Sequence, residues 1–385
     1  MKQIYLDNQA TTPVDSAVFT AMTPWFTEKF GNSSSRNHIY GWEAEEAVEI
    51  SRESVAKIIG SLPKEIIFTS GATESNNIAI QGAANFYRNL GNHIITVKTE
   101  HKAVLDICQE LEKDGFEITY LPVDKNGLLD LNKFKDAIRE DTILTSVMHV
   151  NNEIGVIQPI KEIGALCKKK EIIFHVDAAQ SVGKLPINVN ELGIDILSLS
   201  AHKLYGPKGI GSLYIRRKNP RVQLQPIVFG GGHERGIRSG TLPIPNIVGL
   251  GKACDIAVDV MTEESIRITN FRDELLKGIQ NENPKTRVNG SMEERIGGNL
   301  NLSFPGANNE AIIAALPEIA LSSGSACTTS TMEPSHVLLA LGLSKNEVYS
   351  SLRFSIGRFN TEEEIHTAVE CINNCMKKLG KMKYV

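Results

Sequence analysis

The residues of this chain that could do chemistry follow short apolar runs of strand type. Asp177 and Gln180 come directly after the run 172–176, and Lys203 follows the run 196–199, in a turn that contains glycines and a proline. A carboxylate at a strand end can pair with a protonated pyridine nitrogen, although it can equally cap a helix. A lysine in such a place loses solvent, which favours the neutral amine that forms a Schiff base, whereas most lysines lie on the surface.

A glycine turn follows another of these runs, 65–69. The segment 70–77 reads Ser-Gly-Ala-Thr-Glu-Ser-Asn-Asn and leads into an apolar pattern of helical spacing. The first backbone N–H groups of a helix are unpaired and lie at the positive end of its dipole, so the start of this helix could hold a phosphate. An ordinary capped helix fits these residues too.

Two further polar side chains follow predicted strands. His101 comes after the run 93–97 and offers a ring that can stack on a planar cofactor and carry a proton near neutral pH. Asn152 comes after the run 144–149 and offers a donor and an acceptor to a phenolic oxygen or a carboxylate. Each alone is more typical of a structural residue, but together with a phosphate turn, a carboxylate and a lysine they form a specific set.

The elements that must position these residues alternate between strand and helix patterns. Helix-length segments of mixed polar and apolar residues lie between most of the strand-like runs, as at 41–60, 103–114 and 161–170. This alternation predicts an α/β fold with a mostly parallel sheet that is flanked by helices on both faces. Ligands of such sheets bind beyond the carboxyl ends of the strands, so we expect the residues above to share one site.

A second, smaller α+β domain is expected after about residue 255. The pattern there changes to a long helix, two strand-like runs and a last charged helix, at 263–283, 298–304, 319–322 and 361–379. We therefore predict a large domain over residues 14–255, and a small domain made of residues 1–13 and 256–385. No linker rich in proline, glycine or serine marks the boundary.

Composition excludes several classes of protein. The 385 residues include 41 Lys plus Arg and 45 Asp plus Glu, which gives a net charge of -4 and disfavours nucleic acid as the partner. The six cysteines have neither disulfide-framework nor zinc-site spacing, so we expect no metal. No apolar run is long enough for a membrane span, and no signal peptide is evident, so we expect a cytoplasmic protein with reduced thiols.

At this point the sequence resembles a known family over nearly its whole length. The residues that carry the resemblance run from Tyr-Leu-Asp-Asn-Gln-Ala-Thr-Thr-Pro at 5–13, through the strand ends above, to Arg-Phe-Ser-Ile-Gly-Arg at 353–358. The chain is similar to the cysteine desulfurases of the class V aminotransferase group, which have fold type I of the pyridoxal-phosphate enzymes. The resemblance implies pyridoxal 5'-phosphate as cofactor, L-cysteine as substrate and a homodimer.

The resemblance also implies a role for each matching residue. Lys203 would form the Schiff base with the cofactor, Asp177 would pair with its ring nitrogen, Gln180 would bond its phenolate, and His101 would stack on its ring and carry protons. The phosphate would be held by Ala72, Thr73, Ser200 and His202, and by Thr241 of the other subunit. Asn152 would bind cofactor and substrate, and Arg353 would bind the substrate carboxylate, although Arg358 is close enough in sequence to take that role instead.

Sulfur would be handled by Cys327, which lies in the small-residue segment 322–331. Such a segment can carry a thiolate to substrate and then outward. The predicted function is conversion of L-cysteine to L-alanine, with sulfur passing through a Cys327 persulfide to an iron–sulfur scaffold protein or another acceptor. The chain ends at Val385, short of the longer tail with which the family holds that scaffold, so docking by that route stays open. We predict that the other five cysteines are buried small hydrophobes.

Two other functions were weighed against this one. A class V aminotransferase acting on alanine, serine or phosphoserine would use the same cofactor, but transamination needs no thiol, so Cys327 argues against it. A catalytically silent sulfur carrier or adaptor could keep the fold for binding alone. Retention of both Lys203 and Cys327 argues against that function.

Overall fold

A seven-stranded sheet forms the centre of the computed structural model, which describes residues 3–323 and 333–382. The strands lie in the order β2-β8-β7-β6-β5-β3-β4. Their bounds are β2 (Ile66–Thr69), β3 (His93–Val97), β4 (Glu117–Leu121), β5 (Thr142–Met148), β6 (Ile173–Asp177), β7 (Ile196–Ser200) and β8 (Gly211–Ile215). Only β8 runs antiparallel to its neighbours, so the predicted mostly parallel sheet is confirmed.

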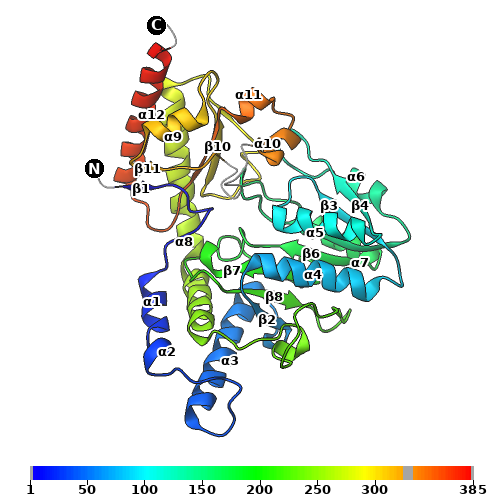
Figure 1. The fold of residues 1–385 in the computed structure, drawn as a ribbon. Helices are drawn as coiled ribbons and strands as arrows, with labels where there is room; N and C mark the ends of the chain where they lie inside the picture. The colour runs from blue at the N-terminus through cyan, green and yellow to red at the C-terminus, as the bar shows by residue number, and fades with distance from the viewer. Residues whose placement is uncertain (1–2, 324–332, 383–385) are drawn as a thin grey trace.

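Helices cover both faces of this sheet (Figure 1). The first cluster of buried apolar side chains includes residues of α3 (Ile39–Ile59), α6 (Leu131–Ala137), α7 (Ile160–Lys169) and the first half of α8 (Ile244–Glu282). The second includes residues of α4 (Ala72–Tyr87) and α5 (Lys102–Lys113). In α5 the buried residues are Val104, Ile107, Cys108 and Leu111, at the spacing that places them on one helix face. This face therefore fixes α5 against the sheet.

A smaller α+β unit lies beyond the central sheet. It contains an antiparallel sheet in the order β12-β10-β9 and a parallel pair β1–β11. Its strands are β1 (Ile4–Tyr5), β9 (Arg287–Val288), β10 (Asn299–Ser303), β11 (Ile319–Ala320) and β12 (Ser351–Ser355). Its helices are the second half of α8, α9 (Asn309–Ala315), α10 (His336–Ala340), α11 (Lys345–Val348) and α12 (Glu362–Met382). A separate apolar cluster fills this unit.

Helix α8 joins the two units without interruption. It begins at Ile244, where a helix was predicted only from residue 263, and it runs for 39 residues. The predicted domain boundary at 255 thus lies inside one helix. Two short helices, α1 (Ser16–Met22) and α2 (Pro24–Thr27), lie with α3 at the opposite end of the molecule from α12 (Figure 1). Within the described residues, no helix combines the length and apolar character that crossing a membrane requires.

Candidate active site

A cavity of about 1150 Å³ lies beyond the carboxyl ends of the central strands. Its wall brings together ten of the twelve residues that the sequence singled out for the site, namely Ala72, Thr73, His101, Asn152, Asp177, Gln180, Ser200, His202, Lys203 and Arg353. Thr241 is exposed and does not line it. Cys327 lies outside the described residues, between Gly324 and Met332.

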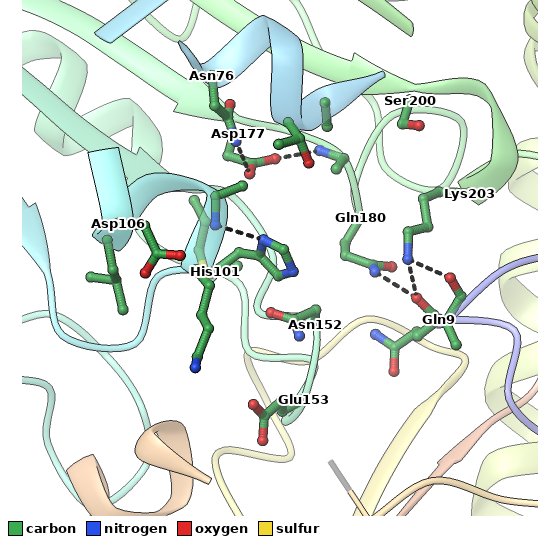
Figure 2. Close-up of a pocket in the computed structure, with 18 of the residues that line it drawn as sticks. Gln9, Asn76, His101, Asp106, Asn152, Glu153, Asp177, Gln180, Ser200 and Lys203 are labelled. Atoms are coloured by element: carbon green, nitrogen blue, oxygen red, sulfur yellow. Dashed lines mark hydrogen bonds between the residues drawn. The ribbon is translucent and has the colours of Figure 1, made fainter. Parts of the chain in front are cut away.

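Asp177 ends strand β6 and is held by two hydrogen bonds. Its Oδ2 accepts from Nδ2 of Asn76 at 2.8 Å, and its Oδ1 accepts from the backbone N–H of Ala179 at 3.0 Å (Figure 2). The side chain is buried, so a cationic group brought against it would meet a carboxylate of fixed orientation. Asn76 was not predicted as a site residue. It lies one helical turn beyond Ala72, and that spacing could have placed it on the same helix face.

Lys203 lies in the short helix Ala201–Lys203 that follows β7. Its Nζ donates to the carbonyl of Gln9 at 2.5 Å and to that of Ala10 at 2.7 Å. The carbonyl of Gln9 also accepts from Nε2 of Gln180 at 2.9 Å (Figure 2). The amine and the amide therefore meet at one backbone oxygen, which comes from the N-terminal segment.

His101 caps the start of α5 with its ring. Nδ1 accepts the backbone N–H of Ala103 at 3.1 Å, so the proton of the neutral imidazole is on Nε2. Burial lowers the pKa of His101, the charge of Asp177 acts in the opposite direction, and the nearby charges of Lys203 and His336 lower it further. His101 is thus an uncharged ring at neutral pH, able to donate from Nε2.

The phosphate-binding residues predicted at α4 lie at the start of a 16-residue helix. Its N-cap is Gly71, whose φ of 153° and ψ of 179° suit glycine alone. A Cβ on the neighbouring Gly211 would come within 2.7 Å of the Gly71 Cα, so position 211 needs glycine for close approach, whereas position 71 needs it for its backbone conformation. His202 lies nearby, and burial, followed by the charge of Lys203, lowers its pKa to about 4.

The opposite wall of the cavity carries Arg353, Asn152 and Glu153. Arg353 lies on β12 and donates to Oδ1 of Asp7 and to the carbonyl of Asn152, at 2.7 and 2.8 Å. Its Nε and the Oδ1 of Asn152 are buried and have no hydrogen-bond partner among the described residues. Glu153 accepts from the hydroxyl of Ser335, and burial raises its pKa to about 7.

Arg358 lies elsewhere. Its guanidinium pairs with Asp15 and Glu264 and packs over the ring of Tyr205, 4.1 Å from the ring centre. It does not line the cavity, whereas Arg353 does. The geometry therefore favours Arg353 over Arg358 as the residue that meets a substrate carboxylate.

The donor set of this cavity fits a phosphorylated pyridine aldehyde. Asp177 could pair with a ring nitrogen, Lys203 is a primary amine for the aldehyde, and the start of α4 with Ser200 and His202 offers donors to a phosphate. Unpartnered buried polar atoms also remain on residues that line the cavity: within the described ranges, Nε2 of Gln9 and Oδ1 of Asn76 lack partners. Such atoms are expected where a polar ligand completes the site.

Comparison with known proteins identifies the family. The model of the class V aminotransferases matches residues 4–367. The chain belongs to the class V aminotransferase family. Two curated members of this family, both named cysteine desulfurase IscS, come from Mannheimia succiniciproducens and Ehrlichia chaffeensis. Each is 57% identical to this chain, over 378 and 379 residues, which covers 98% of it and 93% and 92% of theirs.

Two solved structures have the same architecture as this chain. A NifS-like protein aligns with a TM-score of 0.91 at 37% identity, covering 97% of this chain and 99% of that one. The protein SspA, solved in complex with cysteine, aligns with a TM-score of 0.82 at 40% identity, covering 93% and 100%. The predicted fold and the predicted family are therefore confirmed, and with them the pyridoxal-phosphate cofactor that the family uses.

The cysteines other than Cys327 lie within packed elements. Four are buried, as predicted, and the fifth, Cys371, is partly buried against the apolar cluster of the smaller unit. Burial raises the pKa of Cys108 and of Cys167 to about 12, so both remain protonated thiols at neutral pH. A thiol in that state is a poor nucleophile.

Proposed function

We propose that this protein is a cysteine desulfurase that converts L-cysteine to L-alanine and transfers the sulfur to Cys327. The observation that carries the proposal is the meeting of an amine, a fixed carboxylate, a neutral imidazole and a buried guanidinium around one cavity, in a chain 57% identical to curated cysteine desulfurases. The relative solved with cysteine supports the same substrate.

The cofactor end of the site would work through Lys203 and Asp177. Bound pyridoxal phosphate supplies an electron sink for the bond that breaks next to the substrate amine. Asp177 would pair with the ring nitrogen and favour its protonated form, and Asn76 holds Asp177 in place. The Lys203 amine would be the base that accepts the Cα proton of the substrate. The carbonyls of Gln9 and Ala10 hold that amine at the wall of the cavity.

The substrate end would bind and split L-cysteine. Arg353 and Asn152 bind the carboxylate through atoms that are otherwise unpaired within the described residues. The Cys327 thiolate attacks the substrate sulfur, so an S–S bond forms while the Cβ–S bond breaks. The electron pair of the broken bond stays with carbon, which takes up a proton to become the alanine methyl group. His101, whose Nε2 carries a proton, is placed to supply one.

Mass spectrometry after brief exposure to L-cysteine tests this proposal. We expect a sulfur-sized adduct on the peptide that contains Cys327, together with one equivalent of alanine. Cys327→Ser should keep the cofactor absorbance and lose the adduct, and Lys203→Ala should lose the borohydride-trapped pyridoxyl group. Cys254→Ser serves as the matched control and should keep both. Normal sulfide release by Cys327→Ser, or alanine consumption that needs a keto acid, would overturn the proposal in favour of a transaminase.

We also propose that the working enzyme is a homodimer. Large apolar side chains are exposed over α1, α2 and α3 and the connections around them, where Phe19, Phe26, Phe30, Ile39 and Trp42 are each more than half exposed. Large apolar side chains exposed over neighbouring elements are typical of a protein interface. The role expected of the exposed Thr241 at the phosphate site of the other subunit also requires a second copy. Sedimentation velocity of the wild type and of Phe26→Glu should show a dimer and a monomer, and a wild-type monomer would contradict the proposal.

The fate of the sulfur extends this function. We propose that it passes to an iron–sulfur scaffold protein or to another acceptor thiol. Retention of radioactive sulfur on Cys327 in the presence of every acceptor tested would contradict the transfer. The expected cytoplasmic location stays a prediction.

A further inference from the structure

A second lysine lies behind the Lys203 site. Lys184 comes one helical turn after Gln180, in the turns that follow β6, and its side chain is partly buried. It lines a small cavity of about 50 Å³ together with Gln9, Tyr205 and Glu264. Gln9 lines this small cavity and also the large one, so Lys184 reaches the back of the wall that carries Lys203.

Lys184 is joined to the Lys203 amine through hydrogen bonds. Its Nζ donates to Oε1 of Gln180 at 3.3 Å. The other end of that amide, Nε2, donates to the carbonyl of Gln9 at 2.9 Å, and Lys203 donates to the same carbonyl at 2.5 Å. A protonated lysine amine can donate hydrogen bonds but cannot accept them. Lys184 therefore requires the oxygen, and not the nitrogen, of the Gln180 amide to face it. With Lys184 in place, the N–H end of Gln180 stays on the side of Lys203.

The charges around Lys184 are unbalanced. Burial, followed by the charge of Lys203, lowers its pKa to about 7; the charge of Glu264 on α8 acts in the opposite direction, and that of Arg353 contributes to the lowering. The Lys184 amine is therefore protonated in only part of the molecules at neutral pH. Of the other titratable groups near it, Tyr205 lines the same cavity, and His202 has its own pKa lowered in part by Lys184. Glu264 already pairs with Arg358, so its charge is shared. Repulsion between Lys184 and Lys203 acts on both amines equally.

We propose that Lys184 is a positioning residue for Lys203, which holds the Gln180 amide in one orientation and, when its own amine is protonated, places a positive charge behind the reactive amine. A neighbouring cation disfavours the protonated form of a lysine and so keeps it nucleophilic and basic. This inference deepens the desulfurase proposal and rests on it, because it needs Lys203 to be the residue that joins the cofactor.

Three substitutions separate the charge from the hydrogen bond. Lys184→Gln keeps a donor for Gln180 and removes the charge, Lys184→Met removes both, and Lys184→Arg keeps both. The measured quantity is the pH midpoint at which the absorbance of the bound cofactor changes as the Lys203 nitrogen loses its proton. We expect Lys184→Gln and Lys184→Met to raise this midpoint by about one pH unit, and Lys184→Arg to leave it near the wild-type value.

The effect of the Lys184–Gln180 hydrogen bond is measured by how long the protein retains pyridoxal phosphate. Lys184→Met should release pyridoxal phosphate several-fold faster than Lys184→Gln during dialysis, because only the former frees the Gln180 amide to turn. Lys169→Met, an exposed lysine of α7, is the matched control and should change neither quantity. Thermal unfolding of each variant without cofactor shows that it folds, and Lys184→Gln keeps the charge test available if Lys184→Met does not.

Midpoints of Lys184→Gln and Lys184→Met within 0.2 of the wild type, taken as about the precision of such a titration, would overturn the charge part of the inference. Equal retention in both variants would overturn the part that concerns Gln180. Failure of the desulfurase proposal itself looks different, because the wild type would then bind no cofactor at Lys203 or form no persulfide.

Discussion

The two walls of the active-site cavity differ in whether the groups expected to meet a ligand have all their polar atoms paired, although Oδ1 of Asn76 on the sheet wall also lacks a partner among the described residues. On the wall made by the central sheet, Asp177 accepts two hydrogen bonds, Lys203 donates two, and the His101 ring is fixed by the helix it caps. On the wall that includes β12, buried atoms of Arg353 and Asn152 lack partners among the described residues. The groups that would contact the permanently bound cofactor are already fixed by hydrogen bonds. The groups that would contact the exchanging substrate keep polar atoms that only the substrate would pair.

Among these substitutions, Asp177→Asn on the wall made by the central sheet should cause the largest loss of activity. The neutral amide no longer balances a protonated ring nitrogen, and we expect kcat/KM for alanine formation to fall about a thousandfold. Stopped-flow measurement of alanine formation with saturating cofactor checks this. The exposed Asp259→Asn on α8 is the control and should keep full activity. A loss below tenfold would mean that the pairing of Asp177 is structural only.

Glu153→Gln tests the other wall through stability. Burial raises the pKa of Glu153 from 4.5 to about 7, so the folded protein holds a proton that the unfolded chain releases. Its contribution to the free energy of unfolding is complete below about pH 4.5 and is lost as the pH rises to 7, a fall of about 3 kcal/mol that the Gln variant should lack. Urea unfolding at pH 5 and pH 8 measures the difference. The exposed Glu363→Gln should show the wild-type fall, and a parallel fall in Glu153→Gln would contradict the pKa assigned.

Arg353→Lys and Arg358→Lys test which arginine binds the substrate carboxylate. The two arginines are five residues apart, but only Arg353 lines the cavity. A lysine at 353 cannot form the paired bonds that a guanidinium makes to a carboxylate, so we expect KM for L-cysteine to rise about thirtyfold with a smaller change in kcat. Lysine at 358 should leave KM unchanged and lower the melting temperature, because Arg358 pairs with Asp15 and Glu264. Steady-state kinetics and thermal melts measure the two effects. A raised KM in Arg358→Lys with an unchanged KM in Arg353→Lys would reverse the assignment.

Asn76→Ala should have the smallest of these effects. It removes one of the two hydrogen bonds to Asp177 and leaves the carboxylate itself, so we expect about a tenfold loss of kcat/KM with an unchanged KM. Asn152→Ala is the counterpart on the opposite wall and should raise KM instead. If both variants changed the same kinetic constant, the division of labour between the walls would be wrong.

Much of the sheet and of its wall could be read from the sequence. Strands β2, β3, β5, β6 and β7 lie within two residues of the predicted runs, because buried parallel strands are continuous apolar segments and polar residues follow them. Strand β8 was missed, since it begins with glycine and follows β7 after a turn that the chemistry of Lys203 already explained. The early start of α8 was missed because Pro245, Gly249 and Gly251 interrupt the helical pattern.

The unpredicted members of the site come from distant parts of the chain. Gln9 meets Lys203 and Gln180 from the N-terminal segment, and Asn299 on β10 donates to Oε1 of Gln9 across most of the sequence. Glu153 has its partner at Ser335. Spacing rules apply within one element, so they cannot reveal contacts that only the closed fold creates. The roles of Cys327 and Thr241 stay predictions that rest on the resemblance.

Helix α8 has a mechanical consequence. At the rise of an α-helix its 39 residues span about 58 Å, and its apolar side chains belong first to the core under the central sheet and then to the core of the smaller unit. Unfolding of this helix would remove packing from both apolar cores at once. We therefore expect the two units to unfold together in one cooperative transition. Two well-separated heat-absorption peaks in calorimetry would show instead that the two units unfold independently in spite of the shared helix.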